Sequence, residues 1–156
     1  MATSNLSNRK GKASEKWGNK RFAVVVSEWN NEITESLFAG CHATLVDHGV
    51  SRHNIIKKIV PGSFELTLGA QWMAQQKEVD AVICLGCVIQ GETRHFEFIC
   101  QSVAQGIKDV ALKYNKPVIF GVLTTDSKQQ ALDRAGGKHG NKGDEAAYTA
   151  IKLLDF

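Results

Sequence analysis

The sequence predicts a single α/β domain in which a four-stranded parallel sheet is covered by helices on both faces. Two observations lead to this prediction. Four short runs rich in Val, Ile and Leu alternate with longer segments whose apolar residues recur at helical spacing. Alternation of strand and helix is typical of parallel sheets, and strands buried on both faces are continuously apolar. Right-handed crossovers then give a three-layer α/β/α sandwich.

The first half of the chain supplies two strand–helix pairs. FAVVVS, residues 22–27, is a short β-branched run suited to a buried strand. A helix over residues 33–48 follows, because Ile33, Leu37, Cys41 and Leu45 recur at helical spacing, and Gly49 can end it. NIIKKIV, residues 54–60, predicts the second strand. Pro61-Gly62 ends this strand, and a helix is expected over residues 63–76.

The second half supplies two further pairs and a final helix. VDAVICLGCVI, residues 79–89, predicts the third strand, and residues 117–123 predict the fourth. Helices are expected over residues 93–114, 127–134 and 144–154, with the Gly- and Lys-rich segment GGKHGNKG as a loop before the last. The long helix should bury one apolar stripe, formed by Phe96, Ile99, Cys100, Val103, Ile107, Val110 and Ala111.

Composition excludes several function classes. At 156 residues with 43% apolar and 22% charged residues, the chain is an ordinary globular domain, expected over residues 21–156. Residues 1–20 lack apolar periodicity and are expected to be a flexible basic arm. Only that arm is strongly positive, so we expect no nucleic-acid partner. No apolar run is long enough for a membrane helix and no secretory signal is present, so a cytoplasmic location is expected.

Cys84 and Cys87 form a CxxC pair, which can indicate a zinc or redox site. On a strand, however, residues three apart point to opposite faces, so the two thiols could not bind one metal ion. No second Cys or His pair completes such a site. We therefore expect no metal, and buried, reduced, structural cysteines.

Ligands of open parallel sheets bind beyond the carboxyl ends of the strands. That rule selects the loops SEWNN, PGSFE, QGETRH and TTDS. Trp29 in the first loop could stack on a flat ring or pack on the following helix as a hydrophobic staple. Ser63 and Glu65 in the second are expected as a helix cap and a first-turn carboxylate, which require no ligand.

The third loop combines a helix start with a histidine. Free backbone N–H groups at a helix start can bind an anion, and His95 in the first turn can transfer protons near neutral pH. A capped helix with a surface histidine is the simpler alternative.

The segment RAGGKHGNKG, although rich in Gly and Lys, is not a Walker sequence. Its cations could contact a phosphate, or the segment could be a solvated loop.

Five motifs occur in order along the chain: Trp29-Asn30, PGSFE, GCVIQGETRHFEF, PVIFGVLTTD and RAGGKHGNKG. Together they resemble the 6,7-dimethyl-8-ribityllumazine synthase family over about residues 20–155. The resemblance implies a flavodoxin-like strand order, 2-1-3-4. It also implies condensation of 5-amino-6-(D-ribitylamino)uracil with 3,4-dihydroxy-2-butanone 4-phosphate, the penultimate step of riboflavin biosynthesis, without a cofactor.

The resemblance assigns roles to three of the loops. Trp29, beside Asn30, is expected to stack on the pyrimidine ring. The PGSFE residues should hold the ribityl chain and the ring edge, and the end of the third strand should present backbone groups to the pyrimidine. These expected contacts are Ser63, Phe64 and Glu65, followed by Cys87, Val88 and Ile89.

The remaining roles concern the phosphate and proton transfer. Glu92 and Thr93 should bind the butanone phosphate through helix-start N–H groups, and His95 should transfer protons. Arg134 should clamp the phosphate, while Phe120 and Lys142 flank the pyrimidine. In the family, Phe120, Arg134 and Lys142 come from the neighbouring subunit. Two departures are Gln90, where many relatives have Arg, and Arg94, where a small residue or Pro is common.

The family assembles as pentamers, which remain single, pair into decamers or close into shells of sixty subunits. The short RAGGKHGNKG segment favours the shell, and riboflavin synthase is a candidate partner. The basic segment over residues 16–21 is expected to add a strand to a neighbour's sheet.

Two alternative functions are compatible with the same fold: an archaeal-type riboflavin synthase and a non-catalytic flavin-binding or shell protein.

Overall fold

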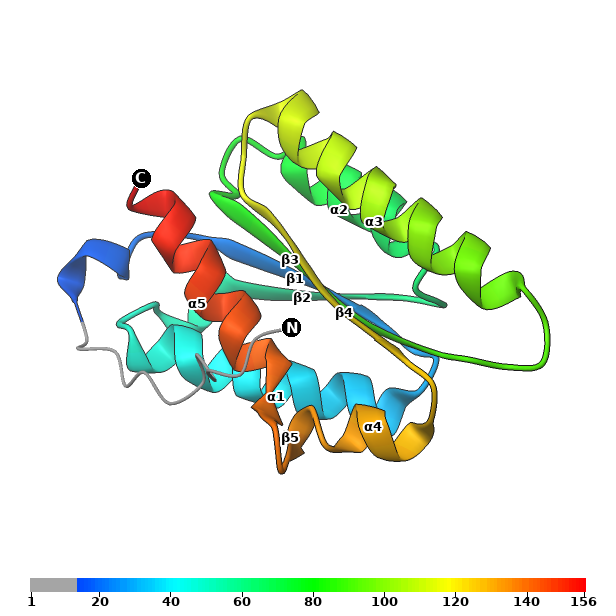
Figure 1. Cartoon of the computed structure of the whole chain (residues 1–156). Helices are drawn as coiled ribbons and strands as arrows, with labels where there is room; N and C mark the ends of the chain where they lie inside the picture. The colour runs from blue at the N-terminus through cyan, green and yellow to red at the C-terminus, as the bar shows by residue number, and fades with distance from the viewer. Residues whose placement is uncertain (1–13) are drawn as a thin grey trace.

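A computed structural model describes residues 14–156 and contains the predicted sheet (Figure 1). All four long strands are parallel, in the order β2-β1-β3-β4, so the expected strand order is confirmed. The strands are β1 (Phe22–Ser27), β2 (Ile55–Val60), β3 (Ala81–Ile89) and β4 (Val118–Thr125). The helices are α1 (Asn31–Asp47), α2 (Leu66–Ala74), α3 (His95–Tyr114), α4 (Lys128–Leu132) and α5 (Lys142–Leu154).

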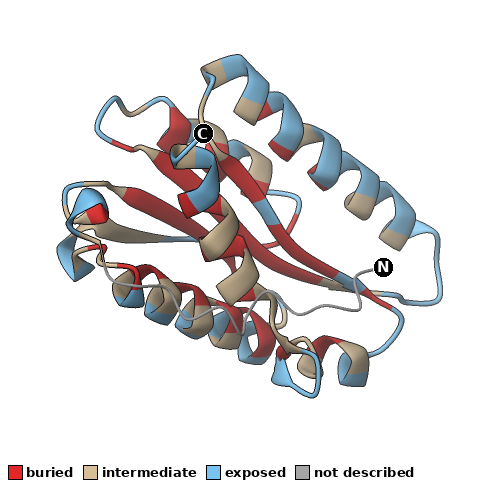
Figure 2. Cartoon of the chain, turned by 60° about the vertical axis from the view of Figure 1, so that its left-hand side comes forward, coloured by how far each residue is buried: buried red, intermediate tan, exposed pale blue. Residues whose placement is uncertain are grey.

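Two apolar cores lie on opposite faces of the sheet, as the three-layer prediction requires. Alternate residues of β1 divide between them: Phe22, Val24 and Val26 face α1 and α5, whereas Ala23 and Val25 face α2 and α3. Figure 2 shows the resulting contrast between buried strands and the exposed outer sides of the helices. The sheet interior is apolar on both faces because each face is covered by helices.

The stripe predicted for the long helix is present on α3. Val103, Ile107 and Val110 are buried against the sheet, and Ile99 and Ala111 pack around them. The CxxC prediction is also confirmed in its geometry. Cys84 belongs to the core beneath α2 and α3, while Cys87 belongs to the core beneath α1 and α5. The two thiols therefore lie on opposite faces of β3.

Each predicted helix start differs from the observed one by one to three residues, and two of these errors fall in loops of interest. The second helix begins at Leu66, so Ser63 is not its cap and the residue at the N-cap position is Glu65. The long helix begins at His95, so Glu92 and Thr93 precede it instead of forming its first turn. In both places a compact turn takes up the residues that sequence periodicity assigned to a helix.

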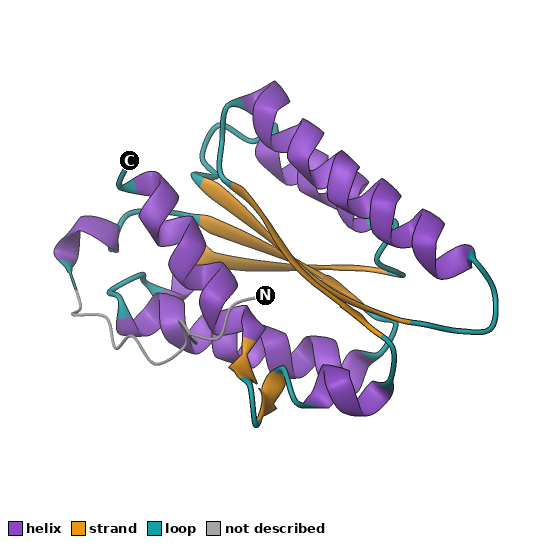
Figure 3. Cartoon of the chain, viewed as in Figure 1, coloured by secondary structure: helices purple, strands orange, loops and turns teal. Residues whose placement is uncertain are grey.

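The Gly- and Lys-rich segment is more ordered than predicted. A small antiparallel hairpin joins β5 (Ala135–Gly137) to β6 (Gly140–Asn141), beside α4 (Figure 3). Positive backbone φ angles of 106° at Gly136 and 73° at Gly140 explain why glycine occupies these two positions. The side chain of Asn141 then caps α5 by accepting a hydrogen bond from the N–H of Gly143 at 2.8 Å.

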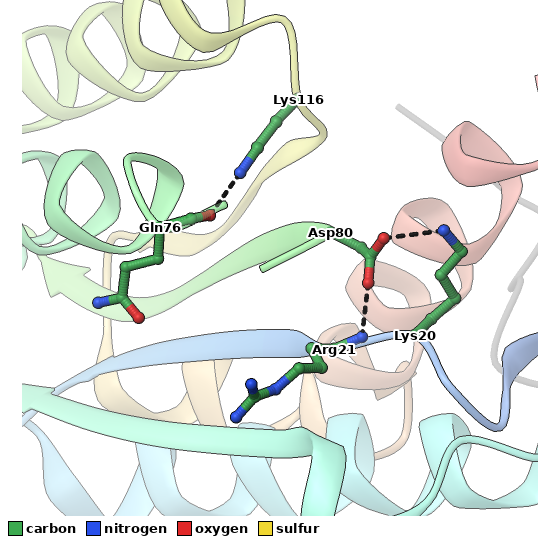
Figure 4. Close-up of polar contacts among 5 residues, drawn as sticks. All are labelled: Lys20, Arg21, Gln76, Asp80 and Lys116. Atoms are coloured by element: carbon green, nitrogen blue, oxygen red, sulfur yellow. Dashed lines mark hydrogen bonds and ion pairs between the residues drawn. The ribbon is translucent and has the colours of Figure 1, made fainter. Parts of the chain in front are cut away.

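A polar cluster secures the opposite, amino-terminal end of the sheet (Figure 4). Asp80 accepts hydrogen bonds from the backbone N–H of Arg21 and from Lys20 Nζ, both at 2.8 Å. Lys116 Nζ donates to the carbonyl of Gln76 at 2.6 Å. These contacts tie together the segments that enter β1, β3 and β4. These contacts hold the amino-terminal ends of the three strands together.

The expected arm lies mostly outside the described residues, which begin at Ser14. Its last part packs on the domain through a 3₁₀ turn, Glu15–Trp17, in which Trp17 is buried in the core beneath α1 and α5. Lys16 forms an ion pair with Asp155 near the carboxyl terminus. Within residues 14–156 no helix is both long and apolar enough to span a bilayer.

Candidate functional site

A hollow of about 750 Å³ opens at the carboxyl ends of β1 and β3, where the fold class predicts a ligand site. Three of the four selected loops converge on it, together with the start of α3. Its wall is formed by Trp29, Asn30, Gly62, Ser63, Phe64, Glu65, Cys87, Val88, Ile89, His95 and Ile99. The hollow is thus mainly apolar with a few polar groups, which is typical of sites for small molecules.

Trp29 presents a free aromatic face at one side of the hollow. Trp29 is 72% exposed, so the alternative that it packs on the following helix as a staple is wrong. Its backbone N–H donates to the carbonyl of Pro61 at 3.1 Å, which fixes the loop. The next residue, Asn30, has a left-handed backbone with φ of 58° and donates from its side chain to the Cys87 carbonyl at 3.0 Å. Asn30 therefore joins the first loop to β3.

The PGSFE segment forms a turn that exposes its aromatic residue and hides its hydroxyl. Glu65 accepts a hydrogen bond from the N–H of Gly62 at 3.0 Å, and the N–H of Leu66 donates to the Ser63 carbonyl at 3.2 Å. Phe64 remains 54% exposed, whereas Ser63 is buried. One carboxylate oxygen of Glu65 is thus used to hold the turn, and the other can accept a bond from a ligand hydroxyl.

The end of β3 borders the hollow because β1 is shorter than β3. The pairing of these two strands runs only to Val26 and Leu85, while β3 stays paired with β4 up to Ile89. Beyond Leu85 the backbone of β3 therefore has a strand neighbour on one side only, and its other side faces the hollow. Burial raises the pKa of the Cys87 thiol to about 11, so this thiol is protonated at neutral pH and is a poor nucleophile.

Gln90 organises the turn that leads to His95. Its N–H donates to the Thr125 carbonyl at 2.8 Å, and its side chain donates to the Gly91 carbonyl at 2.7 Å. His95 is the first residue of α3, and its N–H lies 3.4 Å from Thr93 Oγ1. The His95 side chain is exposed and borders the hollow. Glu92 and Thr93 are exposed beside the hollow and do not line it.

The other three predicted residues lie around a second hollow, of about 520 Å³, along β4 and α5. Phe120 projects from β4, Arg134 follows α4, and Lys142 begins α5. Arg134 Nη1 donates to the Gln130 carbonyl at 2.9 Å, and Lys142 Nζ pairs with Glu145 at 2.7 Å. Among residues 14–156, none lines both hollows. The single chain therefore does not bring Arg134 or Lys142 into the same hollow as His95.

The sequence selected three loops that the structure brings to one hollow, but it did not indicate the contacts that join them. The bond from Asn30 to the Cys87 carbonyl and the bond from Gly62 to Glu65 were not foreseen. Only the bond from Asn30 could have been suspected from the sequence, since Asn at the end of a strand often adopts a left-handed backbone. The separation of the predicted residues into two hollows depends on the path of β4 and α5 in space.

Comparison with known proteins gives consistent results. A family model described as 6,7-dimethyl-8-ribityllumazine synthase matches residues 19–156. A protein of that name from Cytophaga hutchinsonii is 63% identical over 153 residues, which cover 98% of this chain and 96% of the relative. A protein of the same name from Parabacteroides distasonis is 59% identical over 133 residues, which cover 85% and 83% of the two chains.

Proposed function

The chain belongs to the 6,7-dimethyl-8-ribityllumazine synthase family, and from this we propose how its two hollows share the reaction. It is a transferase of riboflavin biosynthesis. The reaction joins 5-amino-6-(D-ribitylamino)uracil to 3,4-dihydroxy-2-butanone 4-phosphate and releases phosphate and water. The amine of one substrate must reach the carbonyl of the other, and a phosphate must leave. Orientation and charge stabilisation are therefore the main tasks of the site.

The hollow at the end of β3 binds the ribitylaminouracil in this proposal. Trp29 offers an exposed indole face on which the flat pyrimidine can stack. The backbone of β3 beyond Leu85 supplies N–H and C=O groups for the ring edge. Glu65 and Ser63 lie on the same wall, where they can receive hydroxyl groups of the ribityl chain. These assignments are supported by the shared lining of one hollow.

The start of α3 is the proposed place of the butanone phosphate and of proton transfer. The positive end of a 20-residue helix and the exposed turn before it favour a phosphate group. Thr93 and Glu92 belong to that turn, which Gln90 holds through its side chain. His95 stands between this turn and the hollow, so it can move protons during imine formation and phosphate elimination.

Completion of the site by a neighbouring subunit is supported by one observation above all: the residues expected to clamp the phosphate and the pyrimidine line a different hollow from His95. We propose that Phe120, Arg134 and Lys142 of one copy complete the site of the next. Large apolar side chains are exposed on α2 and α3, as expected for surfaces that another copy covers. These are Leu68, Trp72, Phe98 and Leu112.

The proposed assembly is a homo-oligomer built from pentamers. The compact β5–β6 hairpin has no insertion that would obstruct further assembly, which favours the closed shell of sixty subunits over single or paired pentamers. Riboflavin synthase is the proposed protein partner, since it would consume the lumazine product. A cytoplasmic location is also proposed. This location is supported by the four cysteines, which form no disulfide, because thiols stay reduced in the cytoplasm.

The direct test is lumazine formation from the two purified substrates, followed by fluorescence, with wild type and Arg134→Ala compared. We expect wild type to exceed the uncatalysed rate. In Arg134→Ala, loss of a charge-assisted phosphate contact should raise KM for the butanone phosphate about 10- to 100-fold. Binding of a ribitylated ligand without turnover by wild type would instead identify a carrier or shell protein.

We further expect Arg134→Ala to lower kcat/KM more than His95→Ala does. His95 is exposed, so solvent can carry protons in its absence, whereas no solvent molecule replaces a fixed guanidinium. Arg134→Lys keeps the positive charge and loses the planar guanidinium, so its kcat/KM should lie between those of wild type and Arg134→Ala. Single-turnover rates in which His95→Ala is the slower variant would contradict this order.

A further inference from the structure

The Arg and Lys side chains of the RAGGKHGNKG segment differ in whether a carboxylate already pairs with them. Lys142 Nζ pairs with Glu145 at 2.7 Å, and Lys138 Nζ pairs with Asp133 at 3.1 Å. Arg134 forms no ion pair within the described part of the chain. Arg134 is therefore the cation of this segment whose charge is left for an anionic ligand, and a guanidinium binds phosphate oxygens strongly.

Arg134 follows α4, which is too short a helix to be stable by itself. The helix spans five residues, Lys128–Leu132, whereas isolated helices shorter than about 12–15 residues are marginal in water. Two side-chain hydrogen bonds cross its end: Gln129 Nε2 donates to Asp133 at 2.9 Å, and Arg134 Nη1 donates to the Gln130 carbonyl at 2.9 Å. The turn that carries Arg134 is therefore held in part by the Asp133 carboxylate.

Asp133 also fastens the β5–β6 hairpin to α4. One carboxylate oxygen binds Gln129 and the other pairs with Lys138 at the hairpin tip, while the Asp133 carbonyl accepts a hydrogen bond from the N–H of His139 at 2.8 Å. The hairpin passes so close that a Cβ atom on Gly137 would lie 2.7 Å from Asp133 Cα. Hydrogen bonds from Gln129 and Lys138 lower the pKa of Asp133, so its carboxylate is ionised at neutral pH.

Arg134 depends on these contacts more than Lys142 does. The carbonyl of Arg134 accepts a hydrogen bond from the N–H of Lys142 at 2.9 Å, and both residues line the second hollow. Lys142 is fixed separately, because the adjacent Gly143 packs against the Leu37 carbonyl of α1. Asp133 does not line the hollow, so it can act on a ligand only through the residues that it holds.

We propose that Asp133 is a positioning residue for the phosphate-bearing substrate. It holds the end of α4 against the hairpin and binds Lys138, so that the guanidinium of Arg134, and not the ammonium of Lys138, is presented to the phosphate. The inference rests on the proposed function, because it concerns the phosphate contact assigned there to Arg134. Asp133 itself contacts neither substrate.

The test measures KM for each substrate in wild type, Asp133→Asn and Asp133→Ala. Asp133→Asn keeps an acceptor for Gln129 and loses the ion pair with Lys138, whereas Asp133→Ala loses both contacts. KM for the butanone phosphate should rise about two- to fourfold in Asp133→Asn and about five- to tenfold in Asp133→Ala. KM for the ribitylamino substrate should change by less than about twofold in both, because Lys142 keeps its place. A merely structural role would not separate the two substrates in this way.

A double variant shows whether Asp133 acts through Arg134. Asp133→Ala combined with Arg134→Ala should give a KM for the butanone phosphate no higher than that of Arg134→Ala alone. Lys128→Gln is the matched control: it removes an exposed ion pair with Glu32 from the same short helix and should leave both KM values unchanged. Particle mass from light scattering shows that each variant assembles, and Asp133→Asn decides the test where Asp133→Ala does not fold.

Two results would overturn this inference while turnover by wild type leaves the proposed function standing. One is a pair of unchanged KM values in the folded Asp133 variants. The other is an additive rise of KM in the double variant, which would mean that Asp133 acts independently of Arg134. Wild type that forms no lumazine from the two substrates would overturn the proposed function as well.

Discussion

At the scale of single residues, burial decides which groups are reactive. Cys84 and Cys87 lie in the two cores, and burial raises the pKa of their thiols to about 12 and about 11. Burial and the charge of Asp144 raise the pKa of the Cys41 thiol as well. All three are therefore small apolar side chains at neutral pH, as predicted for the CxxC pair. The side chains to which we assign roles in binding and proton transfer, Trp29 and His95, are instead exposed, one in a loop and the other at the start of α3.

Because the pKa values of the buried thiols are raised, the stability of the folded protein should decrease as the pH rises through the alkaline range. Below pH 9.0, the ordinary thiol value, Cys84 is neutral in both the folded and the unfolded chain. Between pH 9.0 and about 12 it ionises only when unfolded, so the free energy of unfolding should fall by about 1.4 kcal/mol per pH unit for this thiol. Urea unfolding of wild type and Cys84→Ala from pH 8 to 11 measures this. Equal slopes for the two proteins would contradict it.

At the scale of elements, glycines set how closely α1 and α5 approach. Gly143 in the first turn of α5 packs directly against the Leu37 carbonyl of α1, where a Cβ atom would overlap the backbone. On α1, Gly40 similarly lies against the side chains of Asn141 and Asp144. This contact fixes the start of α5 and, through it, the position of Lys142 in the second hollow. Helix spacing thus positions a candidate site residue.

Gly143→Ala should therefore destabilise the protein, although alanine favours helices more than glycine does. The added methyl group would force α5 away from α1, and overpacking of this kind costs about 1–3 kcal/mol. Gly91→Ala is the matched control, because nothing lies within 4 Å of a Cβ at that position. Thermal unfolding distinguishes the two variants. A higher melting temperature for Gly143→Ala would show that helix propensity outweighs the clash.

At the scale of the whole molecule, the proposed shared site predicts complementation between two weakened variants. Chains carrying His95→Ala are intact at the second hollow, and chains carrying Arg134→Ala are intact at the first. Co-refolding equal amounts should place both intact hollows together in about a quarter of the sites of a mixed ring. Activity of the mixture should then exceed the mean of the two variant activities.

The same experiment separates a shared site from a site complete within one chain. If each chain formed its own site, mixing would give only the mean of the two variant activities. Co-refolded wild type, taken through the same procedure, sets the scale for the comparison. Particle mass from light scattering shows whether the mixed chains assemble as the wild type does.

The sequence by itself determined the elements and the choice of loops. Apolar runs and helical spacing are local properties, so they predicted all four strands of the sheet and the buried stripe of α3. The five motifs likewise identified Trp29, the PGSFE turn and His95, which the structure brings to one hollow. Errors fell at the ends of helices and strands and at the β5–β6 hairpin, where short turns compete closely with helix, strand or loop.

Tertiary structure alone decided which of these residues share a space. Phe120 and Lys142 lie on a second hollow because β4 and α5 carry them there, and Arg134 joins them because it follows α4. Such contacts join residues that are far apart in the chain. Their geometry follows from the packing of whole elements, and no local pattern in the sequence records it.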